Sequence, residues 1–151
     1  MYKYKVGVIS DTHGMIRPEV EEALKGCSLI LHAGDINRQV ILDHLRNIAP
    51  VIAVRGNNDW EWAEHIPETV QTEVYGIQVF MIHNKKYLPR VLQGINLVIS
   101  GHTHKYEEKE ANGITFLNPG SCGPRRFGQE ISLAILKISD HGTFEIEKVE
   151  I

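Results

Sequence analysis

Two histidines separated by one residue, His102 and His104, follow an aliphatic run at residues 95–99. Alternate side chains of an extended backbone point to the same side, so the two imidazoles could face one point or two adjacent points. Neutral imidazole is the commonest protein ligand for divalent transition metals, and Gly101 lets the backbone turn or approach such a site closely. The alternative is a surface histidine pair at the end of a strand.

Asp11 and His13 have the same spacing and follow another apolar run, residues 4–9. This run is rich in β-branched residues, which indicates a strand buried on both faces. Ligands in open α/β sheets collect beyond the carboxyl ends of strands, so a carboxylate and an imidazole here are well placed for chemistry. The alternative is an ordinary loop in which Asp11 caps the following helix.

A second carboxylate, Asp35, follows the aliphatic run at residues 28–32 and gives another strand end a potential ligand. His32 lies three positions earlier, so on a strand its side chain would face away from Asp35. We therefore interpret His32 as a packing or hydrogen-bonding residue and not as a ligand.

The third aliphatic run, residues 50–54, ends in the turn Asn57-Asn58-Asp59. Such a turn is common because Asn and Asp tolerate left-handed backbone conformations. Its position after a third strand nevertheless favours a role in the same site. In the second half of the chain, His83 follows the second arm of a predicted hairpin, so it also lies at a strand end.

The elements that must position these side chains follow from hydrophobic periodicity and from turn signals. Helices are predicted at residues 18–25, 39–47 and 87–93. Strands are predicted at residues 4–9, 28–32, 50–54, 69–75, 77–82, 95–99, 105–111, 114–117, 131–138 and 143–151. Alternating strands and helices in the first third imply parallel strands with right-handed crossovers, whereas the later hairpins imply a more antiparallel sheet.

Two such sheets packed together, with helices outside, would form a layered α/β sandwich whose strand-end loops converge at one edge. The nitrogen and oxygen ligands brought together there are too many for one tetrahedral metal and suit two metals that share a carboxylate. The candidate metal ligands are Asp11, His13, Asp35, Asn57, His83, His102 and His104.

The composition indicates one compact enzyme or binding module, a single domain over residues 1–151 with 42% hydrophobic and 23% charged residues. A net charge of −3 and the lack of any Lys/Arg run longer than two residues argue against extended nucleic-acid binding. Cys27 and Cys122 make no disulfide framework, and no long apolar segment opens the chain. These features predict a cytoplasmic protein with reduced thiols, no signal peptide and no membrane span.

The order of the candidate residues along the chain resembles the motif pattern of the calcineurin-like metallophosphoesterase superfamily. The matching set is Asp11-x-His13, Gly34-Asp35, Gly56-Asn57-x-Asp59, His83 and Gly101-His102-x-His104. The short length, the early Asp-Thr-His-Gly and the turn Asn118-Pro119-Gly120-Ser121 are similar to its small prokaryotic YfcE-like phosphodiesterase branch. The resemblance implies a four-layer α/β/β/α sandwich in which two mixed β-sheets are flanked by helices.

The resemblance also implies two divalent metal ions, with manganese expected and zinc, iron or nickel as alternatives. One ion would be held by Asp11, His13, Asp35 and His104. The second would be held by Asp35, Asn57, His83 and His102, with Asp35 bridging the two ions. We predict that the residues of this second set are also the catalytic ones.

The implied activity is the hydrolysis of small-molecule phosphodiesters. Two cations about 3.5 to 4 Å apart can bind a phosphate, offset its charge and lower the pKa of a bridging water, so that hydroxide attacks in line. Arg125 or Arg126 could reach the substrate phosphate as a fork-shaped donor. A solvated pair of loop charges is the alternative for these two arginines.

Asn58 departs from the family pattern. Many members have a histidine here, placed to protonate the leaving oxygen, and the YfcE-like branch commonly has a cysteine. An asparagine cannot act as a general acid, so we assign Asn58 to substrate binding. We expect a preference for good leaving groups, such as aryl or nucleotidyl esters.

The main alternative to an enzyme is a catalytically weak protein-interaction scaffold, because the retromer scaffold subunit resembles the same branch. Every expected ligand position is filled here, which favours catalysis. A metal-dependent nuclease is disfavoured because the chain has no extensive basic track. The expected partner is therefore a small-molecule phosphoester, without a membrane partner, and the sequence leaves the oligomeric state open.

Overall fold

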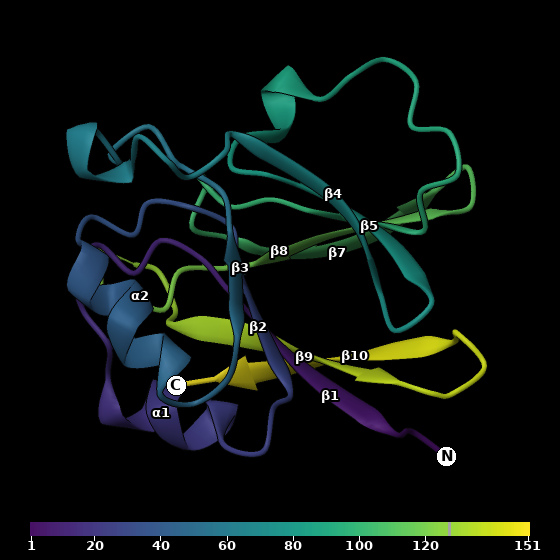
Figure 1. Cartoon of the computed structure of the whole chain (residues 1–151), viewed down its shortest axis with the longest axis horizontal. Helices are drawn as coiled ribbons and strands as arrows, with labels where there is room; N and C mark the ends of the chain where they lie inside the picture. The colour runs from purple at the N-terminus through teal and green to yellow at the C-terminus, as the bar shows by residue number, and fades with distance from the viewer. Residues whose placement is uncertain (127) are drawn as a thin grey trace.

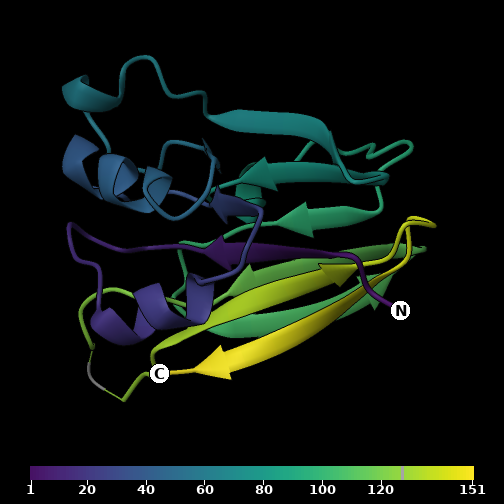
Figure 2. The ribbon, with the colours of Figure 1, turned by 60° about the horizontal axis from the view of Figure 1, so that its bottom comes forward.

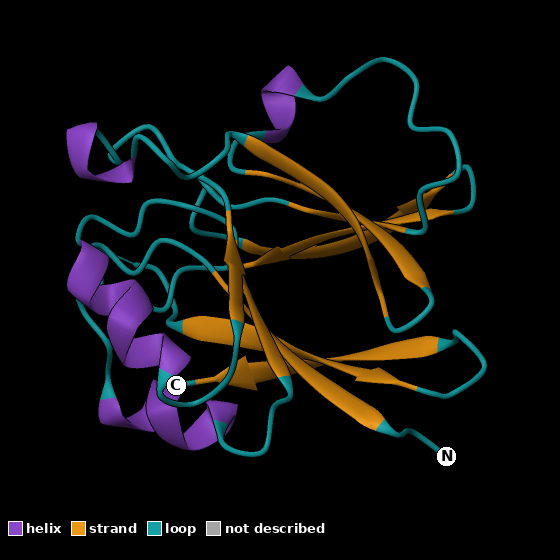
Figure 3. Cartoon of the chain, viewed as in Figure 1, coloured by secondary structure: helices purple, strands orange, loops and turns teal. Residues whose placement is uncertain are grey.

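The computed structural model describes residues 1–126 and 128–151. The strands in these ranges are β1 (Tyr4–Ile9), β2 (Leu29–His32), β3 (Val51–Ala53), β4 (Thr69–Val74), β5 (Ile77–Ile82), β6 (Leu97–Ile99), β7 (Tyr106–Ala111), β8 (Ile114–Pro119), β9 (Ser132–Ile138) and β10 (Phe144–Glu150). The helices are α1 (Pro18–Leu24) and α2 (Gln39–Arg46), and the short 3-10 segments are η1 (Glu61–Ala63) and η2 (Lys85–Tyr87). The strands form two five-stranded sheets, which Figures 1 and 3 show one above the other.

The first sheet has the strand order β10-β9-β1-β2-β3. Its strands β1, β2 and β3 run parallel, as the predicted strand–helix order requires, because α1 and α2 connect them. β9 runs antiparallel to both β1 and β10, so the sheet is mixed. α1 begins at Pro18, whose fixed φ suits the first turn of a helix.

The second sheet has the order β4-β5-β6-β8-β7 and is also mixed. β5, β6 and β8 run parallel, whereas β4 and β7 are antiparallel edge strands joined to their neighbours by tight turns. Asn112 and Gly113, between β7 and β8, have φ values of 53° and 78°. This left-handed backbone is the geometry that an Asn-Gly hairpin turn requires. The predicted exposed strand at residues 105–111 is therefore confirmed as an edge strand.

Three hydrophobic clusters mark the layers of the molecule. The first joins the helices to the first sheet and includes Leu24, Leu42 and Ile30. The second fills the space between the sheets, where Val8 of β1 packs in the same cluster as Met81 of β5. The third covers the outer face of the second sheet with side chains of the segment between β5 and β6. The predicted four-layer sandwich of two mixed sheets is therefore confirmed.

The helix predicted at residues 87–93 is wrong. Only the 3-10 segment η2 forms there, and Leu88 at its end has an extended backbone with ψ of 142°. Leu88 precedes Pro89, whose ring disfavours the helical conformation of the residue before it. The fourth layer of the sandwich is thus a short turn with a loop, on the side of the second sheet opposite α1 and α2.

Loops gather at one end of the sandwich, at the left of the view in Figure 3 and on the far side from the N-terminus in Figure 2. The loops after β1, β2, β3, β5 and β6 all belong to this end, because these strands run in the same direction within their sheets. Among the described residues, no helix combines the length and the apolar character needed to cross a bilayer.

Candidate metal centre

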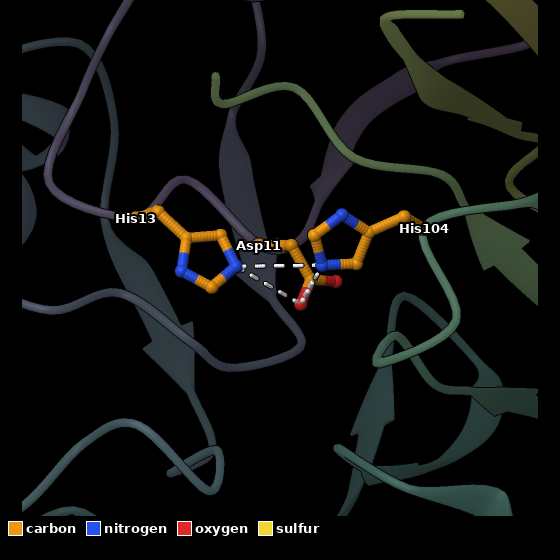
Figure 4. A group of neighbouring side chains, drawn as sticks. All are labelled: Asp11, His13 and His104. Atoms are coloured by element: carbon orange, nitrogen blue, oxygen red, sulfur yellow. Dashed lines mark hydrogen bonds and ion pairs between the residues drawn. The ribbon is translucent and has the colours of Figure 1, made fainter. Parts of the chain in front are cut away.

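A first cluster of potential ligands joins the loop after β1 to the loop after β6 (Figure 4). His104 Nε2 lies 3.3 Å from Asp11 Oδ1, and His13 Nε2 lies 3.8 Å from the same oxygen. The Nε2 atoms of the two histidines are 3.4 Å apart. Asp11 and His104 are buried and His13 is half-buried, so three donor atoms converge on one sheltered point.

A second cluster comprises Asp11, Asp35 and His83, all of them buried. His83 Nε2 lies 3.3 Å from Asp35 Oδ2 and 3.9 Å from Asp11 Oδ1. Asp35 Oδ2 also lies 3.8 Å from His13 Nε2, so this oxygen is placed between the two clusters. Asp11 Oδ1 is common to both clusters as well.

Asn57 and His102 lie beside the second cluster. His102 Nδ1 is 3.3 Å from Asn57 Oδ1, and the rings of His83 and His102 meet edge to face with centroids 5.3 Å apart. The backbone N–H of His102 donates to Asp11 Oδ2 at 3.1 Å. The structure therefore brings all the predicted ligands to one end of the sandwich.

The unpaired atoms of the centre fit a cation. Asp11 Oδ1 and His83 Nε2 are buried and have no hydrogen-bond partner within the described part of the chain. Buried polar atoms are rarely left unpaired, and carboxylate oxygen and imidazole nitrogen are common ligands of divalent transition metals. The donor set and its unmet bonding capacity therefore suit bound divalent ions.

Several of these ligands have a left-handed backbone. Their φ values are 56° for Asp11, 47° for His13, 59° for Asp35, 74° for His102 and 64° for His104. The extended backbone predicted for His102 and His104 is therefore wrong. His104 faces Asp11, whereas His102 faces Asn57, because both follow the strand end in a turn. Uncommon backbone conformations of this kind concentrate at functional sites.

Glycines allow these loops to approach one another. A Cβ atom on Gly101 would lie 2.0 Å from Ser10 Oγ and 2.7 Å from Asp11 Oδ2. A Cβ atom on Gly56 would lie 2.2 Å from Asp35 Oδ1. Real Cβ atoms do not approach other atoms so closely, so each glycine is required by the packing of one site loop against another.

Asp59 holds two of the loops together, whereas the sequence marked it only as part of the turn after the third strand and of the family motif. Its carboxylate accepts the backbone N–H groups of Ile36 at 2.9 Å, Asn37 at 2.7 Å and Gly56 at 2.9 Å. Asp59 is 4% exposed, so these bonds are sheltered from water. The carboxylate thus fixes the loop that carries Asp35 to the loop that carries Asn57.

Asn118 supports the loop that carries the two histidines after β6. Its side-chain amide donates to Gly101 O and to Thr103 Oγ1, both at 3.0 Å, and its oxygen accepts the Gly120 N–H at 2.9 Å. Ser121 Oγ, in the same turn, donates to the backbone oxygen of Asp11 at 3.1 Å. The sequence indicated only a family-like turn at residues 118–121, whereas the structure places Asn118 and Pro119 at the end of β8 and shows the supporting role of the segment.

His32 lies behind the centre, as predicted. Its Nδ1 accepts the Gly34 N–H at 3.0 Å, so Nε2 carries the proton and donates to Thr12 Oγ1 at 3.0 Å. Burial lowers the pKa of His32 to about 3. A neutral imidazole therefore connects the loops after β1 and β2.

The surroundings of the centre lower the pKa of Asp35 and shift the pKa values of His13 and His83 in opposite directions. Burial acts to raise the pKa of Asp35, but His83 and the two Asn58 donors outweigh it and hold this pKa well below its usual range. Burial lowers the pKa of His13 against the opposing pull of Asp35 and Asp11. For His83 burial is outweighed by the two carboxylates, which raise its pKa.

Of the predicted substrate-binding residues, Asn58 contacts the centre directly. Asn58 donates to Asp35 through its backbone N–H at 2.9 Å and its side-chain amide at 3.1 Å, so it is tied to a proposed ligand. Arg125 and Arg126 are exposed on the segment between β8 and β9, and Arg125 Nη1 donates to Gln129 O at 3.5 Å. Substrate binding by these residues stays a prediction.

A cleft of about 710 Å³ opens beside the second half of the centre. Its described lining comprises Arg55, Gly56, Asn57, Glu68, Thr69, Ile82, His83, Asn84, Lys86, Tyr87 and His102. Because three proposed ligands form part of its wall, a molecule held at the centre would have the cleft beside it.

The chain is similar in sequence to proteins of one family. Residues 4–141 match the calcineurin-like phosphoesterase superfamily domain. A probable metallophosphoesterase from Methanothermobacter thermautotrophicus is 37% identical over 131 residues, which are 77% of this chain and 76% of that protein. A phosphodiesterase from Methanocaldococcus jannaschii is 27% identical over 140 residues, which are 78% of this chain and 84% of that protein.

The fold is similar to that of Vps29 from Entamoeba histolytica, in a crystal structure of the wild-type protein complexed with zinc. The TM-score is 0.74 with 26% sequence identity, and the match covers 97% of this chain and 98% of that one. The same arrangement of two packed sheets thus occurs in a protein that has been crystallised with a divalent metal.

Proposed function

Because the chain belongs to the calcineurin-like phosphoesterase superfamily, we propose that it is a dinuclear-metal-dependent phosphodiesterase that acts on small-molecule phosphodiesters. One observation carries the proposal. Two buried carboxylates and the imidazoles of separate loops converge, and Asp11 Oδ1 and His83 Nε2 lack hydrogen-bond partners within the described residues. The similarity to a phosphodiesterase supports a diester as the substrate.

The proposed ligand sets are those that the family resemblance implies. They add Asn57 and His102 to the clustered residues and take Asp35 as the shared ligand, whereas Asp11 is the residue common to both clusters. Asp11, His13, Asp35 and His104 would hold one ion, and Asp35, Asn57, His83 and His102 would hold the other. The position of Asp35 Oδ2, 3.8 Å from His13 Nε2 and 3.3 Å from His83 Nε2, supports Asp35 as the shared ligand. We propose manganese, with zinc, iron or nickel as alternatives, because this mixed set of oxygen and nitrogen ligands accepts each of these metals.

The residues of the chain prepare the centre for its ions. Ala33 O accepts from His83 Nδ1 at 2.8 Å, so the lone pair of His83 Nε2 faces the centre. Ser10 Oγ donates to Asp11 Oδ2 at 2.6 Å, which leaves Asp11 Oδ1 free to bind. Two bound divalent cations would offset the charge of a phosphate. They would also lower the pKa of a water molecule bound to them towards neutral pH.

The test is metal-dependent hydrolysis of bis(p-nitrophenyl) phosphate. The wild type should turn over this diester when manganese is added and not with a chelator. The variant His102→Ala should lose at least about 100-fold in kcat/KM, because a proposed ligand beside the substrate is missing. The matched control is His65→Ala, which lies outside the proposed ligand set and should keep the wild-type rate.

The alternative is a catalytically weak protein-interaction scaffold. Its supporting observation is the similarity of the fold to Vps29. The presence of every proposed ligand favours catalysis, and absence of metal-dependent turnover on both diesters and monoesters would favour the scaffold. The cytoplasmic location expected from the sequence stays a prediction.

A further inference from the structure

We propose that the cleft beside the metal centre binds an aromatic group of the phosphoester substrate, and that this group stacks on Tyr87. This inference rests on the proposed phosphodiesterase function. The cleft volume of about 710 Å³ is in the range of small-molecule sites, so a phosphate group alone would leave most of it unfilled. His83 and His102 form part of its wall, so the ester group of a bound phosphate has this space beside it.

Tyr87 lines the cleft and presents an accessible ring. It is 69% exposed, so the ring is open to a ligand in the cleft. Aromatic rings contribute a large contact area at a small loss of side-chain entropy, and they prefer other rings in offset-stacked geometry. An open ring on the wall of a metal-site cleft therefore suits a planar ligand.

The position of Tyr87 is fixed relative to the proposed ligands. β5 ends immediately before His83, and η2 begins two residues after it. Asn84 caps η2 by accepting the Lys86 N–H on its side-chain oxygen at 3.0 Å. The segment that carries a proposed metal ligand thus also carries the aromatic ring, and the short capped turn holds the two at a set separation.

The charges around the ring favour an anionic ligand. Lys86 Nζ lies 5.8 Å from the centroid of the Tyr87 ring, and among the described residues Lys86 forms no ion pair. Arg55 also lines the cleft, where its guanidinium donates to Glu68 at 3.1 Å. A cation beside an exposed ring adds to the attraction for a negatively charged aromatic molecule. The chemistry of the cleft therefore points to a nucleotidyl group, which combines a planar base with phosphate.

Adenosine 5′-monophosphate and ribose 5-phosphate test the proposal because they differ only in the base. Their dissociation constants are measured by calorimetry on the manganese-loaded full chain, with inorganic phosphate as a reference. The nucleotide should bind the wild type about three- to tenfold more tightly than the sugar phosphate. Tyr87→Ala should abolish this difference and Tyr87→Phe should keep it.

Two neighbouring lysines provide a matched control. Lys86→Gln should weaken both ligands by about two- to fivefold, because it removes an unpaired charge from the cleft wall. One position earlier in the chain, Lys85→Gln removes a positive charge that pairs with Glu107. This variant should leave the dissociation constants of both ligands unchanged. The substituted residues are all exposed, so we expect all variants to unfold at the wild-type temperature, and equal thermal unfolding would confirm that folding is unaffected.

The possible failures are distinguishable. Equal binding of the nucleotide and the sugar phosphate to the wild type, or a nucleotide preference that survives in Tyr87→Ala, would overturn the stacking site. The proposed function would stand in that case if inorganic phosphate still bound. If inorganic phosphate did not bind the metal-loaded protein at all, both the stacking site and the proposed function would be overturned.

Discussion

We predict that Asn58 restricts the centre to esters with good leaving groups. It is tied to Asp35 by two hydrogen bonds, and its amide N–H is too weak an acid to protonate a leaving group at neutral pH. We predict that Asn58→His speeds the hydrolysis of alkyl diesters by about 100-fold, the lower end of general-acid effects, and changes aryl diesters far less. Steady-state turnover of one alkyl and one aryl diester gives the ratio.

Asn58→Ala is the control for this change, because it alters the same contacts without adding an acid. It should leave the aryl-to-alkyl ratio at the wild-type value. An Asn58→His enzyme with that same ratio would show that the leaving group departs without need of a proton donor at this position.

His32 should make the stability of the metal-free protein depend on pH. Its folded pKa is lowered from 6.5 to about 3 by burial, so between these values the unfolded chain binds a proton that the folded chain does not. The contribution of neutral His32 to the free energy of unfolding is therefore fully present above pH 6.5. It is lost as the pH falls below this value, by up to about 1.4 kcal/mol for each pH unit.

Denaturant unfolding between pH 7 and pH 4 measures this effect by comparison of the wild type with His32→Gln. The free energy of unfolding of the wild type should fall more steeply towards low pH than that of the variant. Parallel curves for the two proteins would refute the assignment of a depressed pKa to His32.

At the scale of single residues, the sequence indicated the candidate ligands because each follows an apolar run at a strand end, and metal binding by these residues stays a prediction. It did not predict their left-handed backbone, since φ is set by contacts such as the bond from the His102 N–H to Asp11. The sequence also did not predict that Asp59 fixes the loop after β2 to the loop after β3. Its partners include Ile36 and Asn37, which are more than 20 positions away and become neighbours only in the folded chain.

At the scale of elements, the loops after β2 and β3 depend on Asp59. Asp59→Ala would leave two buried backbone N–H groups and one partly buried one without acceptors, and a buried group of this kind costs about 1–3 kcal/mol. We predict a loss of about 2–5 kcal/mol in the free energy of unfolding of the metal-free protein. Metal affinity should fall by about 10- to 100-fold, because Asp35 and Asn57 are held less firmly.

Asp43→Ala serves as the control for this substitution. Asp43 is an exposed residue of α2 whose carboxylate lies 3.7 Å from Arg46, and its removal should change stability by less than about 0.5 kcal/mol. Denaturant unfolding and metal titration check both variants. Equal stabilities of Asp59→Ala and Asp43→Ala would mean that the loops are held by other contacts.

The regular elements were predictable where hydrophobic periodicity was strong. The strands and the helices α1 and α2 lie within a few residues of their predicted positions. The segment at residues 87–93 was not, because its apolar residues cover the second sheet from an irregular loop, and Pro89 prevents a helix. Periodicity reports burial on one side of a segment but does not distinguish a helix from such a loop.

At the scale of the whole molecule, the centre depends on how the two sheets pack. Asp11, Asp35 and Asn57 follow strands of the first sheet, whereas His83 and the two later histidines follow strands of the second. The hydrophobic cluster between the sheets, which includes Val8 and Met81, fixes the position of one set of loops relative to the other. The layers were predictable from the order of elements, but the separation of the ligand atoms is a property of the packed sheets.

Counting the metal ions bound between the loops of the two sheets is the sharpest test of the proposed dinuclear centre. Elemental analysis of protein equilibrated with manganese should give two ions per chain, and an anomalous-scattering map of crystals grown with manganese should show two peaks between Asp11, Asp35 and His83. Loss of both peaks is expected for Asp35→Asn, the shared ligand. A map of the wild-type protein that shows no peak at these residues, although ample metal was supplied, would rule out the proposed dinuclear centre.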